Sequence, residues 1–214
     1  MSIRVLIADD HKVVADGLLH MLQAQEGMEV VGTARSGREA VQRTMELQPD
    51  IVIMDSNMAD LNGIEATRQL RERDSPARVV MLSVHAEPQH VVRALRAGVS
   101  GYVPKSSAGT DVVDAVRAVH SGKRYLHPTI AHEVLEQLVD AEKAEDPVSR
   151  LSSRERQVLQ MIAEGNGVSD IAAALSLSVR TVETYRARLM EKLDIRDVPS
   201  LVKFAIRNGI TSLE

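Results

Sequence analysis

The chain has 214 residues, of which 44% are hydrophobic, with no cysteine and a formal net charge of -4. This length suits one large or two modest domains, and the lack of cysteine excludes a disulfide framework and thiolate metal sites. No apolar stretch approaches the roughly 18 residues of a membrane span, and acidic residues follow the first apolar run too closely for a signal peptide, so we expect a cytoplasmic protein with no membrane partner.

The first 125 residues alternate short β-branched runs with segments of helical spacing. Between the runs, apolar residues recur every three or four positions, as in Val14, Leu18 and Leu22. Five β–α units of this size predict an α/β domain at residues 1–125, with a five-stranded, doubly wound parallel sheet. The predicted strands are RVLIA (4–8), VVGTA (30–34), DIVIMD (50–55), RVVMLS (78–83) and GYVP (101–104).

Residues 126–148 are predicted to be a linker that contains an amphipathic helix. Ile130, Val134, Leu138 and Val139 are spaced for one helical face, and a charged stretch follows that Pro147 ends. Residues 149–214 are then predicted to form an all-α domain of four helices. The first begins at a capping box, SSRE (152–155), and the second is SDIAAAL. Ser178 caps the third helix, VRTVETYRARLMEKL, and Pro199 opens the fourth, PSLVKFAIRNG.

Polar residues stand where the predicted strands end. The first strand leads to Asp9 and Asp10, the third to Asp55, the fourth to Ser83 and the fifth to Lys105. Because ligands of an open parallel sheet bind beyond the carboxyl ends of its strands, we expect these side chains to converge. Any one of the aspartates could instead only cap a helix. His11 is expected to be a solvated neighbour of the cap and not a metal ligand.

Three clustered carboxylates repel one another, and a hard divalent cation removes that cost. Mg²⁺ suits a site of one or two carboxylates with phosphate and water. With the metal bound, Asp55 remains an anion and can attack phosphorus, because aspartyl phosphates are an established type of covalent intermediate. Lys105 would then balance charge on the phosphoryl oxygens and Ser83 would donate a hydrogen bond. These residues therefore predict a Mg²⁺-dependent phosphoryl acceptor.

The sequence resembles the response regulators of two-component signalling, in their LuxR-type (NarL/FixJ) class. The resemblance covers nearly the whole chain and is carried by VLIADDH, IVIMD, NGIEATRQLR, VVMLS, AGVSGYVPK and LSSRERQVLQMIAEG. It implies a CheY-like receiver with strand order 2-1-3-4-5, a sensor histidine kinase that phosphorylates Asp55, and at most slow autodephosphorylation. It also implies an activation-dependent homodimer, with RNA polymerase as a further candidate partner.

The resemblance assigns further roles within the predicted acceptor site. Asp10 would bind Mg²⁺ directly, Asp9 through water, and Asn57 through its main-chain carbonyl. Ser83 and Tyr102 would form the switch pair, and Lys105 would bind the phosphate; Tyr102 also fits a surface aromatic on the edge strand. Two positions depart from the family. Ser56 replaces an apolar residue, and Ala59 replaces a proline, which loosens the loop beside the acceptor.

The third C-terminal helix has two faces. On a helical wheel, Val182, Tyr185, Leu189 and Leu193 share one side and should be core. The stretch VSDIAAALSLSVRTVETYRARL resembles a helix-turn-helix, so the opposite face is predicted to enter the major groove of double-stranded DNA. Residues 149–214 contain 10 basic and 8 acidic residues, which is only weak support. The predicted DNA-binding residues are Arg180, Thr181, Glu183, Thr184, Ala187, Arg188 and Lys192.

Within this set, Thr184 and Ala187 would approach bases and the thymine methyl group, and Glu183 is a candidate partner for cytosine's amino group. Arg180, Arg188 and Lys192 would meet phosphates. A solvated helix face in a small bundle is the alternative.

Val202 and Ile206 on the last helix are predicted dimer contacts. We therefore interpret the chain as a DNA-binding transcriptional regulator switched by phosphorylation of Asp55. Two alternatives remain open: a Mg²⁺-dependent phosphohydrolase using the same residues, and a DNA binder whose first domain only dimerises.

Overall fold

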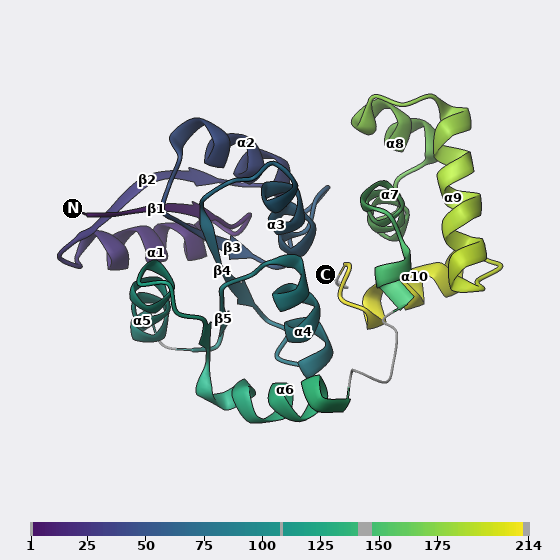
Figure 1. Cartoon of the computed structure of the whole chain (residues 1–214). Coiled ribbons are helices and arrows are strands. Elements are labelled where there is room, and N and C mark those ends of the chain that lie inside the picture. Colours follow the sequence, from purple (N-terminus) through teal and green to yellow (C-terminus); the bar gives the residue numbers. More distant parts are fainter. Residues whose placement is uncertain (1, 108, 141–146, 212–214) are drawn as a thin grey trace. The chain divides into compact units, whose positions relative to one another are not determined.

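The computed structural model describes residues 2–107, 109–140 and 147–211, and within residues 135–140 it describes the backbone alone. The chain divides into two compact units, residues 1–139 and residues 140–214, which are described separately below (Figure 1).

The first unit is built on a parallel sheet with the order β2-β1-β3-β4-β5-β6. The predicted parallel α/β fold and the order of its first five strands are confirmed. Among the described residues the sheet has a sixth strand that was not predicted, a two-residue strand beside β5. The strands are β1 (Ile3–Ala8), β2 (Met28–Ala34), β3 (Ile51–Asp55), β4 (Arg78–Ser83), β5 (Gly101–Pro104) and β6 (Tyr125–Leu126).

Helices cover both faces of this sheet, which is why its central strands are mostly apolar, with charged or hydroxyl residues only near the strand ends. Leu6, Val52 and Met81 point into a core with α2, α3, α4 and the start of α6. Their neighbours Val5 and Ile53 point to the other face, into a core with α1 and α5 (Figure 1). The helices are α1 (Lys12–Gln23), α2 (Gly37–Leu47), α3 (Gly63–Glu72), α4 (Pro88–Ala97), α5 (Gly109–His120) and α6 (Pro128–Asp140).

The amphipathic helix that we assigned to the linker is α6, and its first half packs on the first unit. Ile130 and Val134 are buried in the same core as Tyr102 and Val91. The side chains of Leu138 and Val139, and most of the charged stretch before Pro147, lie outside the described residues. The division at residues 125 and 148 stays a prediction.

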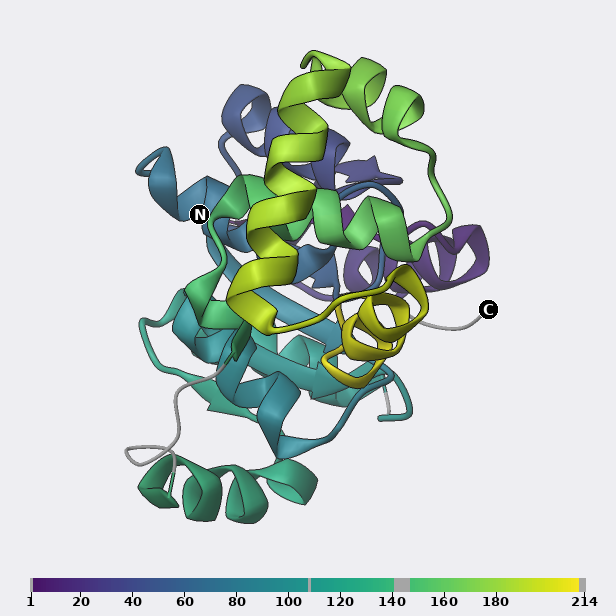
Figure 2. The same ribbon diagram turned by 90° about the vertical axis from the view of Figure 1, so that its right-hand side faces the viewer.

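The second unit is a helical bundle, which confirms the predicted all-α domain (Figure 2). The predicted capping box is present: Ser152 accepts a hydrogen bond from the Glu155 amide, and Glu155 accepts one from the Ser152 amide. Val182 and Leu189 are fully buried, with Tyr185 and Leu193 packed beside them. None of the described helices is long and apolar enough to cross a membrane. After a short 3-10 turn (Pro147–Arg150), the helices are α7 (Ser153–Ala163), α8 (Val168–Leu175), α9 (Val179–Leu193) and α10 (Val198–Arg207).

Candidate functional site

The carboxyl ends of β1, β3 and β5 bring three charged side chains together. The Lys105 ammonium lies 2.8 Å from Asp9 Oδ2 and 2.7 Å from Asp55 Oδ2. Both carboxylates are almost completely buried, while the lysine side chain is 15% exposed. The structure therefore brings together groups that lie up to 96 residues apart in the sequence, as the strand-end argument predicted; their chemical roles stay predictions.

Backbone hydrogen bonds between neighbouring strand ends hold this arrangement. The Ser56 amide donates to the Leu82 carbonyl (2.8 Å), and the Lys105 amide donates to the Ser83 carbonyl (2.7 Å). The start of α3 packs closely on the end of β3, since a Cβ atom at Gly63 would lie 2.0 Å from the Asp55 carbonyl oxygen. Only glycine fits there, so the Asn-Gly pair at 62–63 helps to position the loop that follows Asp55.

Burial dominates the electrostatics of Asp55. It raises the pKa of the Asp55 carboxyl from 3.8 to about 6, although the hydrogen bond and positive charge of Lys105 act in the opposite direction. Burial disfavours the charged form of Lys105 as well, but its hydrogen bonds and ion pairs with Asp55 and Asp9 outweigh this, so the pKa of Lys105 is raised. A carboxyl pKa shifted this far by burial, beside a specific charged partner, marks a candidate functional site.

This pKa predicts a pH dependence of stability in metal-free protein. The folded state binds the Asp55 proton more tightly than the unfolded state. The stability that this protonation contributes is therefore fully present below the unfolded pKa and is lost as pH rises through about 6. We expect Asp55→Asn to leave stability nearly unchanged at pH about 4 and to raise it by roughly 2–3 kcal/mol at pH about 7. Urea unfolding of both proteins in chelator across this range measures the difference. A difference in unfolding free energy between the two proteins that does not change with pH would contradict the raised pKa of Asp55.

Asp10 and His11 complete a group of possible metal ligands with Asp9 and Asp55. One ligand atom from each lies within 4.8 Å of the others, and Asp10 is the exposed carboxylate of the group. The His11 side chain is 66% exposed, and its Nδ1 atom lies 2.7 Å from Asp10 and 3.3 Å from Asp9. Its role as a solvated neighbour of the cap and not a metal ligand stays a prediction. Carboxylate oxygens are ligands of the kind that Mg²⁺ takes, so the residues fit this ion.

Ser83 and Tyr102 lie on the same face of the sheet, beneath the loop that follows β4. Ser83 is completely buried, and its hydroxyl accepts hydrogen bonds from the Ser56 hydroxyl (2.8 Å) and the His85 amide (3.0 Å). Tyr102 is 1% exposed, and its hydroxyl donates a hydrogen bond to the His85 carbonyl (2.6 Å). The alternative interpretation of Tyr102 as a surface aromatic is therefore wrong.

Asn57, on the neighbouring loop, contacts the same histidine: its side-chain amide lies 3.2 Å from His85 Nε2. Sequence reasoning missed both this contact and the Ser56–Ser83 hydrogen bond. His85 stands two residues after Ser83, but no periodicity in the sequence points to either pairing.

In the second unit, most of the predicted DNA-binding residues lie on one open side of α9. Arg180, Glu183, Thr184, Ala187 and Arg188 are exposed. The Thr184 hydroxyl donates to the Arg180 carbonyl within the helix (2.9 Å). Its methyl group is therefore the part of this side chain with no other role, which fits an apolar contact to a base.

Lys192 is exposed as well, whereas Thr181 and the two predicted dimer contacts are only partly exposed. Lys192 donates to the buried carboxylate of Glu155 (2.7 Å), and Thr181 bonds to Ser178 at the helix cap. Val202 and Ile206 are half-buried on α10. Lys192 thus has a structural partner that any phosphate contact must share or displace.

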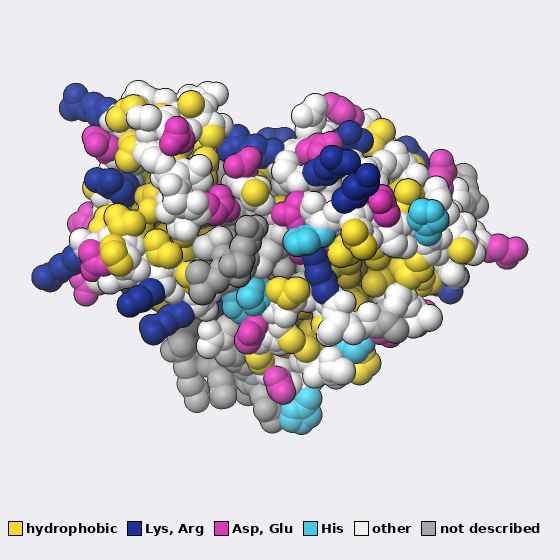
Figure 3. Space-filling model, turned by 180° about the vertical axis from the view of Figure 1, so that it is seen from behind, with side chains coloured by type: hydrophobic (Ala, Val, Ile, Leu, Met, Phe, Trp, Pro, Cys, Tyr) yellow, Lys and Arg dark blue, Asp and Glu magenta, His cyan; other side chains and the backbone are white. Residues whose placement is uncertain are grey.

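Charge alone does not mark this unit as a polyanion-binding surface. On the face that Figure 3 shows, basic and acidic side chains are interspersed among the described residues of both units. This agrees with the small positive charge of residues 149–214, and leaves the shape and residues of α9 as the main support.

Two protein families match the chain. The family described as "Response regulator receiver domain" matches residues 5–117, and "Bacterial regulatory proteins, luxR family" matches residues 149–205. Response regulator UvrY of Escherichia coli is 38% identical over 212 residues, which are 99% of this chain and 97% of that protein. Oxygen regulatory protein NreC of Staphylococcus carnosus is 36% identical and covers 97% of this chain and 98% of its own length.

Solved structures give the same correspondence. A two-component response regulator of the LuxR family from Aurantimonas is 37% identical, with a TM-score of 0.62, and covers 65% of this chain and 99% of its own. A complex of the response regulator RcsB with DNA is 25% identical, with a TM-score of 0.60, and covers 97% of this chain and 99% of its own.

Proposed function

Because the chain belongs to the two-component response regulators of the LuxR (NarL/FixJ) type, we propose that a sensor histidine kinase phosphorylates Asp55 in the presence of Mg²⁺ and so controls its binding to DNA. A receiver domain joined to a LuxR-type DNA-binding domain supports a phosphorylation-regulated transcription regulator and not an enzyme. The observation that carries the proposal is the contact of the Lys105 ammonium with both Asp9 and Asp55.

Phosphoryl transfer needs an anionic Asp55 and compensation for the charge that it receives. With a pKa of about 6, Asp55 is mostly ionised at neutral pH. A carboxylate oxygen of Asp55 forms the new O–P bond as the N–P bond of the kinase's phosphohistidine breaks; the electron pair stays on the imidazole nitrogen, which takes up a proton. Asp9, Asp10, Asp55 and the Asn57 carbonyl would hold Mg²⁺, which offsets the negative charge of the carboxylates and phosphoryl oxygens.

The phosphoryl group would be read out through Ser83 and Tyr102. The phosphoryl group adds close to two negative charges beside Lys105, and these charges attract the Ser83 hydroxyl. A movement of Ser83 toward the phosphate gives up its hydrogen bonds to Ser56 and His85. Tyr102 then leaves the His85 carbonyl and fills the vacated space. The resulting change in the first unit would favour a homodimer, with Val202 and Ile206 as contacts in the second.

A twofold dimer places two copies of α9 on two half-sites about one helical turn of DNA apart. In each, Thr184 and Ala187 would face bases, Glu183 would accept from a cytosine amino group, and Arg180, Arg188 and Lys192 would meet phosphates. We assign the receiver to residues 1–125 and the DNA-binding domain to residues 149–214. The protein would act where the chromosome and RNA polymerase are, in the cytoplasm.

Acetyl phosphate with Mg²⁺ tests the proposal against its alternatives. We expect the intact mass to rise by one phosphoryl group, with slow release of phosphate as Asp55 dephosphorylates. Steady turnover of a small phosphate ester would favour the phosphohydrolase instead. Because of the departures at Ser56 and Ala59, a phosphorylation-independent DNA binder is the third candidate. For such a protein, a gain in mass on treatment would not change the affinity for DNA.

Ser56→Ala should make phosphorylation easier. The Ser56 hydroxyl holds Ser83 in its present position (2.8 Å), and a hydrogen bond of this kind has a net value of about 0.5–1.5 kcal/mol. Without this hydrogen bond, the state in which Ser83 can move toward the phosphoryl group is populated more often. We therefore expect the rate of phosphorylation by acetyl phosphate to rise by roughly 2- to 10-fold. Ser121→Ala, an exposed serine on another segment, is the matched control. A rate that falls in Ser56→Ala would show that this hydroxyl assists the transfer.

A further inference from the structure

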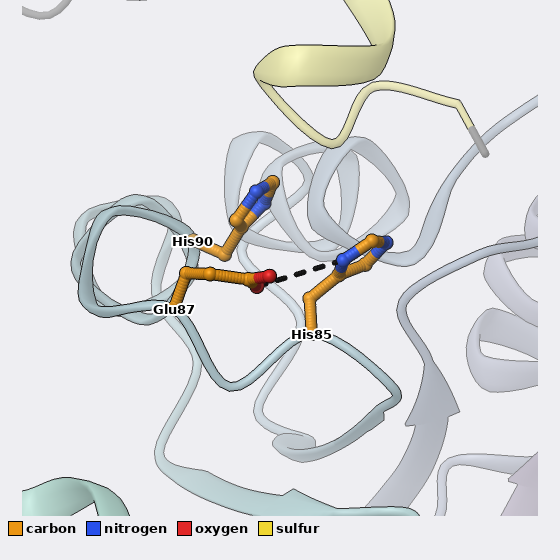
Figure 4. A group of neighbouring side chains, drawn as sticks. All are labelled: His85, Glu87 and His90. Atoms are coloured by element: carbon orange, nitrogen blue, oxygen red, sulfur yellow. Dashed lines mark ion pairs between the residues drawn. The ribbon is translucent and has the colours of Figure 1, made fainter.

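Two histidines and a glutamate form a second group of possible metal ligands, beside the acceptor site and distinct from its carboxylates. His85 lies in the loop after β4, Glu87 is the cap residue of α4, and His90 is in the first turn of that helix. One ligand atom from each lies within 4.8 Å of the others. Figure 4 shows the Glu87 carboxylate directed at the His85 ring, with the His90 ring on the same side of the loop.

The three side chains are close neighbours. His85 Nδ1 lies 3.6 Å from Glu87 Oε2, and the two imidazole rings stack with their centroids 4.8 Å apart. Burial lowers the pKa of His90 to about 4, and the positive charges of His85 and Arg93 add to this. His90 is therefore neutral at physiological pH and needs to lose no proton before it binds a metal.

We propose that His85, Glu87 and His90 bind a divalent transition metal ion of the Zn²⁺ class. Imidazole nitrogen favours such borderline ions, whereas Mg²⁺ prefers the all-oxygen group at Asp9, Asp10 and Asp55. Three protein ligands leave a fourth tetrahedral position for water.

Closing this site requires the side chains to move. Bonds of about 2.0–2.1 Å place tetrahedral donors roughly 3.4 Å apart, so donors that lie up to 4.8 Å apart must approach by at most about 1.4 Å. Because an imidazole nitrogen binds a metal in the plane of its own ring, one of the two stacked rings, whose planes differ by 17°, must also rotate. The side chain of Glu87 is 64% exposed and is free to move toward the rings.

The second ring nitrogen of His85 also has a polar neighbour. A metal-binding histidine usually has its second ring nitrogen hydrogen-bonded to a neighbouring polar group. With Nδ1 toward Glu87, the second nitrogen of His85 is Nε2, and it lies 3.2 Å from Asn57 Nδ2. Metal binding through Nδ1 places the proton on Nε2, so the Asn57 amide would have to turn its oxygen toward the ring to accept that proton.

The position of the site gives metal binding a consequence, which rests on the proposed function. The main chain of His85 bonds to both members of the switch pair: its amide donates to Ser83 and its carbonyl accepts from Tyr102. A metal that ties His85 to α4 through His90 stabilises this arrangement. The switch requires Ser83 and Tyr102 to leave it, so the metal would oppose phosphorylation-dependent activation.

Zn²⁺ titration of the unphosphorylated full chain, in excess Mg²⁺ and with a chromogenic chelator as competitor, tests the site. We expect one Zn²⁺ per chain. Glu87→Gln and His90→Gln should each lose at least about 10- to 100-fold in affinity, the range seen when even an outer partner of a metal site is removed. His11→Gln, which alters the other ligand group, is the matched control and should keep the wild-type affinity.

Wild-type affinity in Glu87→Gln, or loss of binding in His11→Gln, would overturn the proposal. Because Glu87 is mostly exposed, this variant keeps the test valid if His90→Gln does not fold.

A second measurement addresses the consequence. We expect Zn²⁺ to slow phosphorylation by acetyl phosphate several-fold in the wild type and to have no effect on Glu87→Gln. Equal slowing in both proteins would overturn the coupling. The binding titration uses neither phosphate nor DNA, so it stands even if Asp55 proves not to be phosphorylated.

Discussion

Asp55→Asn is expected to abolish phosphoryl uptake and, with it, every response of DNA binding to acetyl phosphate. The amide has no anionic oxygen to attack phosphorus, while the buried position and its Lys105 neighbour remain. The intact mass of the variant should not change after treatment with acetyl phosphate and Mg²⁺. Its affinity for DNA should equal that of the untreated wild type.

Asp60→Asn is the matched control for this experiment. Asp60 is exposed in the same loop and has a positive φ of 66°, a conformation that asparagine adopts as readily as aspartate. The control should gain one phosphoryl group like the wild type. Stoichiometric labelling of Asp55→Asn would mean that another group accepts the phosphoryl, and unaltered regulation in this variant would favour the phosphorylation-independent DNA binder.

Arg188→Glu is expected to have the second large effect, a loss of DNA affinity of about 10- to 100-fold. Arg188 is exposed on the predicted groove-facing side of α9, so reversal of its charge should not disturb the core. A phosphate contact replaced by a repulsion also weakens the dependence of affinity on salt concentration. Fluorescence anisotropy with duplex DNA at several salt concentrations measures both quantities.

Arg207→Glu makes the same change in charge at an exposed position of α10 and serves as the control. Its affinity should stay close to that of the wild type, with a similar salt dependence. Equal losses in both variants would show that the net charge of the unit, and not the face of α9, determines binding. Lys192 is less suitable for this test because its ion pair with buried Glu155 couples DNA contact to stability.

Much of the fold could be predicted because the relevant patterns are local. The central strands of the first unit are mostly apolar because both of their faces are covered, and such runs are visible in the sequence. The convergence of Asp9, Asp55 and Lys105 then follows from strand direction alone, since parallel strands end at one edge. The capping box at Ser152 and the buried face of α9 are likewise local signals.

The features that sequence reasoning missed depend on contacts between segments with no periodicity. β6 has only two residues, too few for a recognisable strand pattern. The amphipathic pattern of α6 shows that the helix has a packing partner but does not identify it as the first unit.

The pairings of Ser56 with Ser83 and of Asn57 with His85 are set by two loops, and that of Lys192 with Glu155 by the packing of α9 on α7. These contacts leave no pattern in the sequence from which they could be predicted.

The central claim is that a phosphoryl group on Asp55 changes the affinity of the second unit for DNA. The most direct test measures DNA affinity and phosphoryl occupancy in the same samples, taken during treatment with acetyl phosphate and Mg²⁺. We expect affinity to rise in proportion to occupancy and to return as the aspartyl phosphate hydrolyses. Full occupancy with unchanged DNA affinity would contradict the account.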